Sequence, residues 1–164
     1  MDRVIERYQS LQLKNETINL FALVDGYQYE QHTGIRMQHR VNINRPIFVG
    51  TEDKPLSVAG PWLIDMMKSS DQLEEIELLE RALPSVSCII RSVDLEGLSQ
   101  LLQLRLDVIL PDGRTALLRF FDPRVLGKLD QIMNSKQRAE FFHLIDEWHF
   151  VYNGQRVVTG TNHA

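Results

Sequence analysis

Cysteine is almost absent from the sequence, since Cys88 is the only one among 164 residues. A single thiol excludes an internal disulfide framework and a cysteine-rich zinc site. Cys88 lies in the apolar run from Val86 to Ile90, so we interpret it as a small core residue rather than a reactive thiol.

Long hydrophobic runs are also absent, because no segment approaches the roughly 20 apolar residues of a membrane-spanning helix. We therefore expect no membrane partner.

The sequence also has no excess of basic over acidic residues. The 18 Lys and Arg residues are outnumbered by 22 Asp and Glu residues, which gives a net charge of -4. This balance argues against a nucleic-acid partner, because phosphate binding requires a basic surface. The stretch Met1 to Arg7 carries charges where a signal peptide needs an apolar core, so we expect a cytoplasmic protein. The remaining composition, 43% hydrophobic and 24% charged, indicates one globular domain over residues 1–164.

Common catalytic motifs are the fourth absence. The sequence has no Gly-x-Ser-x-Gly elbow, no P-loop and no Gly-x-Gly-x-x-Gly motif. His143, Asp146, Glu147 and His149 resemble a metal or acid–base group in composition. The two histidines are six positions apart, however, whereas a helical zinc pair needs a spacing of four. We therefore predict no metal, no cofactor and no catalysis.

The most informative pattern begins at Leu104. Apolar and polar residues alternate over 104–110 and again over 115–121, which is typical of strands with one buried face. Pro111-Asp112-Gly113 lies between the two runs and has the chemistry of a tight turn. The sequence thus predicts a central β-hairpin.

A helix is predicted directly after this hairpin, from Asp122 to Met133. Asp122 suits the N-cap, because its carboxylate can accept from unpaired amides of the first turn, and Pro123 suits the first helical position. Arg119 and Arg124 flank Asp122 and can pair with it. We interpret Arg119, Asp122, Pro123 and Arg124 as a structural clasp that joins the hairpin to the helix, although two arginines at a helix start could also form an anion site.

The rest of the chain mixes both kinds of element. Helices are expected around residues 4–11, 61–67, 71–83, 95–102 and 135–148, and strands around 19–24, 44–51 and 85–91. Asp71, Asp94 and Ser135 are the predicted helix caps, and Glu52 to Pro55 is a predicted turn. Asn153-Gly154 predicts a C-terminal β-hairpin. The expected fold is α+β, a mostly antiparallel sheet covered by amphipathic helices.

Five large apolar side chains are candidates for contact with a protein partner. Tryptophan anchors interfaces and methionine repacks easily, so such residues can form an adaptable binding surface. The same residues also fit a hydrophobic core, and we favour the core for Trp62. The candidates are Trp62, Met66, Met67, Phe141 and Trp148.

Four stretches together resemble a known family. Arg119 to Leu126, preceded by the Pro-Asp-Gly turn, resembles the signature of bacterial type VI secretion effector chaperones, also called effector adaptors (Tap or Tec) and first catalogued as a domain of unknown function. Phe21 to Gly26 looks like that family's first strand with its terminal Asp. Pro55-Leu56 with Gly60 to Leu63 looks like its middle motif. Ser92 and the leucine-rich helix after it lie where the family has a helix, and the matches follow the family order.

This resemblance implies a non-secreted binding protein of the cytoplasm. Such a protein holds a cognate toxin, the effector, and helps to load it onto the VgrG spike or the PAAR tip of that spike. Many members carry a second lobe after the signature region, whereas this sequence ends soon after Asn153-Gly154. If cargo is held between two lobes in those members, we expect this chain to hold it differently.

Two rival functions stay open at the level of sequence. Asp25 ends an apolar strand, where haloacid dehalogenase-type enzymes place a nucleophilic Asp, but the second carboxylate of that chemistry is replaced by Tyr27. We therefore interpret Asp25 as a turn or cap residue. The first rival is nevertheless a small phosphotransfer or hydrolytic enzyme that uses Asp25 and Asp122 with Arg119. The second is a structural subunit of the secretion apparatus.

Overall fold

The computed structural model describes residues 1–48 and 57–161. Its elements in chain order are α1 (Asp2–Gln12), β1 (Asn19–Asp25), α2 (Gly26–Thr33), β2 (Asn44–Pro46), β3 (Pro61–Asp65), the 3-10 helix η2 (Ser70–Gln72), α3 (Leu73–Ala82), β4 (Val86–Arg91), α4 (Leu95–Gln103), β5 (Asp107–Ile109), β6 (Thr115–Leu117), α5 (Pro123–Ile132), α6 (Ser135–Phe141), β7 (Glu147–Tyr152) and β8 (Gln155–Thr159).

A six-stranded antiparallel sheet forms the centre of the molecule. Its strand order is β2-β3-β1-β4-β7-β8, so β1 lies between β3 and β4. Every residue of β1 after Asn19 is buried, as expected for a central strand that is covered on both faces. The predicted α+β fold with a mostly antiparallel sheet is confirmed.

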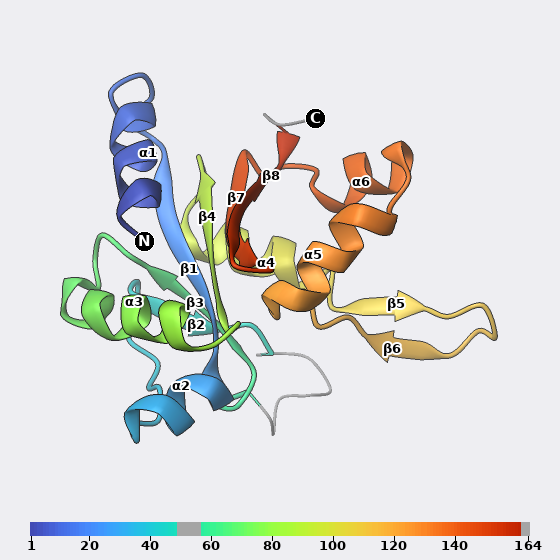
Figure 1. Ribbon diagram of the computed structural model, residues 1–164, viewed down its shortest axis with the longest axis horizontal. Coiled ribbons are helices and arrows are strands. Elements are labelled where there is room, and N and C mark those ends of the chain that lie inside the picture. The colour runs from blue at the N-terminus through green and yellow to red at the C-terminus, as the bar shows by residue number, and fades with distance from the viewer. Residues whose placement is uncertain (49–56, 162–164) are drawn as a thin grey trace.

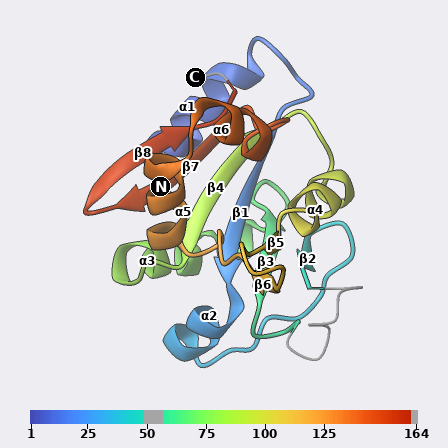
Figure 2. The same ribbon diagram turned by 90° about the vertical axis from the view of Figure 1, so that its right-hand side faces the viewer.

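Helices cover both faces of this sheet (Figures 1 and 2). Because side chains alternate along a strand, the buried residues divide into two hydrophobic clusters. The first cluster joins Ala22 and Val24 to α1, α2 and α3, and contains the buried Cys88. The second joins Phe21 and Leu23 to α4 and α5. The core position predicted for Cys88 is confirmed.

Several helix caps and one turn are formed by the residues predicted for them. Asp25 and Asp94 accept backbone hydrogen bonds at the starts of α2 and α4. Asn153 and Gly154 have φ angles of 50° and 74°, which is the type I′ turn that joins β7 to β8. The C-terminal hairpin therefore adds to the edge of the main sheet.

The helix predicted over residues 61–67 is wrong, because Pro61–Asp65 is strand β3. All five of its residues are buried between β1 and β2. A short apolar run without polar alternation fits a fully buried strand as well as a buried helix, so periodicity alone could not distinguish them.

The long helix predicted over residues 135–148 is also wrong. It ends at Phe141 as α6, and Leu144 has a φ angle of 63°, which no helix continues through. Trp148 lies in strand β7 instead. The N-cap of α6 is Asn134 rather than Ser135, and it forms a capping box with Gln137.

Three further expectations need correction. Asp71 does not cap α3, which begins at Leu73 without a side-chain cap, because the Asp71 carboxylate binds Arg40 instead. The predicted hairpin is present as β5 and β6, but it is a separate two-stranded sheet with short strands. Leu104, expected on its buried face, is the C-cap of α4 and is 82% exposed.

Part of one prediction lies outside the described residues. The strand expected over 44–51 is observed as β2, which covers Asn44–Pro46. Residues 49–51, the turn predicted at 52–55 and the pair Pro55-Leu56 are not among the described residues. In the helices that are described, none has the length and apolar character needed to cross a membrane.

Candidate functional site

Residues from two distant sequence motifs meet where β1 ends. Asp25 ends β1, and its carboxylate accepts a hydrogen bond of 3.1 Å from the backbone N–H of Gln28, which caps α2. Arg119 follows β6 in the chain, and its guanidinium lies 3.6 Å from the Asp25 carboxylate. This ion pair connects the first-strand motif to the signature segment.

The second acidic residue of the site is Asp122, the N-cap of α5. It accepts from the backbone N–H of Arg124 at 2.9 Å and from the Arg124 side chain at 3.0 and 2.7 Å. Pro123 occupies the first turn, where no N–H is required. Asp122 and Arg124 form the local pair expected for the clasp, whereas Arg119, expected beside Asp122, forms its ion pair with Asp25 and so ties the clasp to the main sheet.

The two carboxyl groups have pKa values displaced in opposite directions. Burial raises the pKa of Asp25 above its ordinary value, although the Gln28 amide and Arg119 oppose the rise. Burial would raise the pKa of Asp122 too, but the hydrogen bonds and charge of Arg124 outweigh it and hold that pKa below its ordinary value. Asp122 is therefore the more strongly stabilised anion of the two.

A pocket of about 320 Å³ opens beside the Asp25–Arg119 pair, and we call it the hairpin-base pocket. Its walls come from β1, α2, β6 and the segments before β3 and after β2. They consist of Asp25, Tyr27, Phe48, Ala59, Gly60, Leu117, Arg119 and Phe121. The Arg119 guanidinium lies 5.4 Å from the centre of the Phe121 ring, within the range of a cation–π contact. The pocket is thus mainly apolar, with one ion pair at its wall.

Phe48 and Gly60 explain part of the shape of this pocket. The Phe48 ring lies so close to Gly60 that a Cβ atom there would stand 2.4 Å from a ring carbon. Phe48 also meets Phe121 edge-on, with ring centres 6.2 Å apart. The middle motif therefore needs glycine at this position because an aromatic ring takes the space of a side chain.

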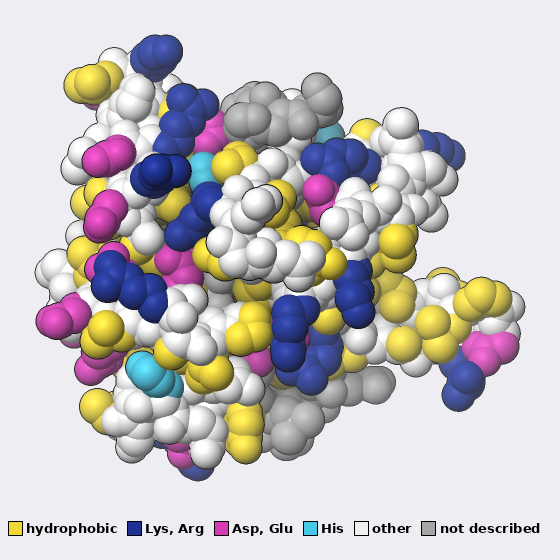
Figure 3. Space-filling view, viewed as in Figure 1, with side chains coloured by type: hydrophobic (Ala, Val, Ile, Leu, Met, Phe, Trp, Pro, Cys, Tyr) yellow, Lys and Arg dark blue, Asp and Glu magenta, His cyan; other side chains and the backbone are white. Residues whose placement is uncertain are grey.

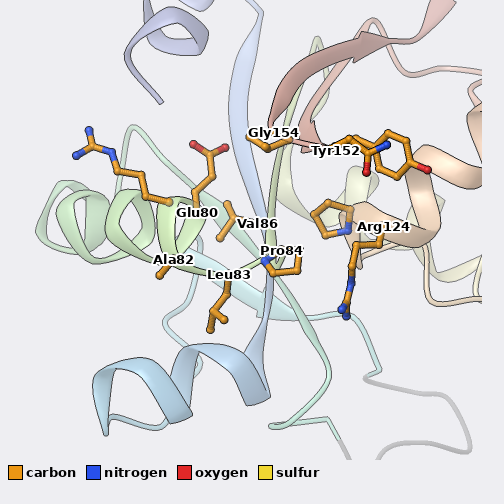
Figure 4. A pocket seen from close by; sticks show the side chains of 12 residues that line it. Glu80, Ala82, Leu83, Pro84, Val86, Arg124, Tyr152 and Gly154 are labelled. Carbon is orange, nitrogen blue, oxygen red and sulfur yellow. The ribbon is translucent and has the colours of Figure 1, made fainter.

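A second pocket, of about 220 Å³, lies on the other side of the clasp (Figure 4). Arg124 and Tyr152 line one side of it, and Glu80, Ala82 and Leu83 line the other. Glu80 is not available as a free charge, because Arg156 binds it at 2.6 and 2.9 Å. This second pocket is smaller than the hairpin-base pocket.

The five partner candidates do not form one surface. Trp62 and Met66 pack in the first core cluster and are only 2% and 3% exposed. Trp148 is fully buried in the second cluster, where the partly buried Phe141 stacks on it with an angle of 6° between the rings. Met67 is 55% exposed. Of these five side chains, only Met67 and part of Phe141 are exposed enough to meet a partner.

The histidines and carboxylates near residue 147 do not form a metal site. His149 lies in β7 and its Nε2 is 2.9 Å from the Glu147 carboxylate, which also binds Arg7 of α1. In the part of the chain that is described, no three His, Cys, Asp or Glu side chains are placed to hold a metal ion together. Through its contact with Arg7, Glu147 thus connects α1 to the sheet.

Tyr27, Phe48 and Leu117 are site residues that sequence reasoning missed. A signal was present for Leu117, because the alternation over 115–121 puts it on the same side of the chain as Arg119 and Phe121. No local signal marks Phe48, which reaches the pocket from a segment distant in sequence.

The fold and the site define an α+β domain in which a clasp of two Asp–Arg pairs lies between two pockets. Comparison with known families gives a match over residues 20–140 to the family described as "Domain of unknown function (DUF4123)". The chain belongs to this family. No curated protein and no solved structure matches the chain.

Proposed function

We propose that this chain is a cytoplasmic effector chaperone of a type VI secretion system. It binds one cognate toxin and helps to load that toxin onto the VgrG spike or the PAAR tip. The binding requires no cofactor and no covalent chemistry. The segment held is one that would otherwise stay exposed or aggregate.

The observation that carries this proposal is the convergence of the motifs that resemble the chaperone family. Asp25 of the first-strand motif and Arg119 of the signature segment form an ion pair, and Gly60 of the middle motif lines the same pocket. The family match over residues 20–140 covers all three positions. A site lined mainly by apolar and aromatic groups suits the binding of a protein segment.

One observation favours a second candidate, a small phosphotransfer or hydrolytic enzyme. The pKa values of Asp25 and Asp122 are displaced in opposite directions, and such pairs can divide the roles of acid and base. We prefer the chaperone because both carboxylates already have structural partners: each caps a helix and each faces an arginine. Magnesium-dependent phosphatase activity that disappears in Asp25→Asn, with the fold intact, would favour the enzyme.

Co-purification tests the chaperone proposal. The tagged chain is expressed in its own bacterium while the secretion genes are active, and the bound proteins are identified by mass spectrometry. We expect one toxin, with or without VgrG. Recovery of the chain alone under these conditions would contradict the proposal. A tagged variant of an exposed surface residue away from both pockets, Lys136→Ala, serves as the matched control and should retain the toxin.

A further inference from the structure

The β5–β6 hairpin extends away from the rest of the molecule (Figure 1). Hydrophobic side chains lie along it in the space-filling view (Figure 3). Ile109 is 81% exposed and Leu117 is 39% exposed, although both belong to the strands themselves. Two strands alone form a marginal sheet in water, so an exposed apolar ribbon of this kind favours addition of a further element.

The backbone pairing shows which groups of the ribbon are unused. The N–H of Leu118 donates to the carbonyl of Leu106, and the N–H of Leu110 donates to the carbonyl of Arg114. Along an antiparallel ribbon, pairs of facing residues that are hydrogen-bonded to each other alternate with pairs that are not. The residues of the non-bonded pairs turn their N–H and C=O groups outward, away from the partner strand. The outward residues are Asp107, Ile109, Thr115 and Leu117. Within the described residues neither outer edge of the ribbon is paired with another strand.

The two edges differ in what lies beside them. The β6 edge leads into the hairpin-base pocket, because Leu117, Arg119 and Phe121 follow one another at every second position and all line it. The residues of β5 do not line this pocket. An extended segment on the β6 edge would therefore gain backbone hydrogen bonds and also place a side chain in a cavity of about 320 Å³.

We infer that the outer edge of β6 binds an extended, apolar segment of the cargo toxin as a third strand of the hairpin. This inference rests on the proposed function and specifies its binding surface. The outward N–H and C=O groups of the edge can pair with a partner that has free backbone groups, which an extended chain has and a helix does not. The pocket selects an apolar side chain, because the two charged groups among its described lining residues, Asp25 and Arg119, already neutralise each other.

A proline pair tests the edge directly. Thr115→Pro removes an outward N–H from β6, and Ile109→Pro removes one from its cross-strand partner on β5. Neither change breaks a bond of the ribbon itself, so the two variants are matched. The probe is an inactive variant of the toxin identified by the co-purification experiment, with affinity measured by calorimetry. We expect Thr115→Pro to weaken binding at least about tenfold and Ile109→Pro to weaken it less than about threefold.

Several outcomes would overturn the inference, and each is distinct. Equal affinities of wild type and Thr115→Pro, or equal losses in both proline variants, contradict the β6 edge but leave the chaperone function intact. Failure of the wild-type chain to bind contradicts the chaperone function and the inference together. A wild-type dimer that Thr115→Pro converts to a monomer, in the absence of toxin, assigns the edge to a second copy of the chain instead.

A side-chain variant keeps the test decisive if the proline variant does not fold. Folding is checked by circular dichroism and thermal melting. Leu117→Ser removes the apolar contribution of β6 to the pocket, and Ile109→Ser is its control on β5. We expect only Leu117→Ser to weaken binding of the toxin. An unchanged affinity would overturn the inference.

Discussion

At the scale of single residues, Asp122 is the anion that the site stabilises most clearly. It caps α5 and binds the Arg124 side chain. Asp122→Ala should lower the free energy of unfolding by about 1 kcal/mol through loss of the cap. Asp122→Asn should lose less, because asparagine is also a good N-cap. Denaturant unfolding at pH 7 measures both, and equal stability of all three proteins would contradict this role.

The stabilisation by Asp122 should depend on pH. Its pKa is lower in the folded protein than in the unfolded chain. A group of this kind stabilises the fold above its unfolded pKa, and the stabilisation disappears as the pH falls through the folded pKa. The difference in stability between wild type and Asp122→Asn should therefore shrink on acidification below about pH 4. A difference that stays constant with pH would show that the charge has no role.

Asp25 should behave in the opposite way. Burial raises the pKa of Asp25, so its ionised form is disfavoured in the folded protein. The contribution of Asp25 to the free energy of unfolding therefore increases as the pH falls through the folded pKa. Asp25→Asn keeps an N-cap acceptor and removes the buried charge. We expect its denaturation midpoint at pH 7 to be no lower than that of the wild type. A clear loss of stability would mean that the ion pair with Arg119 outweighs the burial of the charge.

At the scale of elements, the packing of α5 on β7 depends on Gly127. A Cβ atom at this buried position would lie 2.4 Å from the Tyr152 ring. Gly127→Ala should therefore lower stability by about 1–3 kcal/mol, even though alanine favours helix by about 1 kcal/mol. The neighbouring exposed residue provides the control, since Lys128→Ala should change stability by less than about 0.5 kcal/mol. A thermal melt of Gly127→Ala that matches the control would contradict this packing.

The elements also show what the sequence could and could not predict. The caps Asp25, Asp94 and Asp122 and the turn at Asn153-Gly154 depend on neighbouring residues, so local reasoning found them. Strand β3 depends on pairing with β1 and β2, which no local pattern specifies.

The helix predicted over 135–148 failed for a similar reason. The spacing of its apolar residues suits a helix, yet α6 ends at Phe141 and the guanidinium of Arg105 binds the carbonyls of Phe141 and His143. Arg105 lies just after α4 and is distant in sequence from α6, so its contribution could not be predicted. In the candidate site the Asp122–Arg124 pair was predictable because it is local, whereas the Asp25–Arg119 pair requires the complete sheet.

At the scale of the whole molecule, the fold brings an ion-paired clasp and an apolar pocket together with the β6 edge, which has no strand partner within the described residues. This combination suits a protein that holds a segment of another chain. The chaperone and structural-subunit functions differ in how many toxins depend on the protein. A chaperone serves one toxin, whereas a structural subunit serves all of them.

Secretion in a strain that lacks this chain tests the central claim most directly. The amount of each type VI toxin is measured by mass spectrometry in the cells and in the medium, with and without complementation by the wild-type gene. We predict that one toxin disappears from the medium and that the others are secreted at wild-type levels. Loss of every toxin from the medium would identify a structural subunit, and unchanged secretion of every toxin would contradict a role in loading.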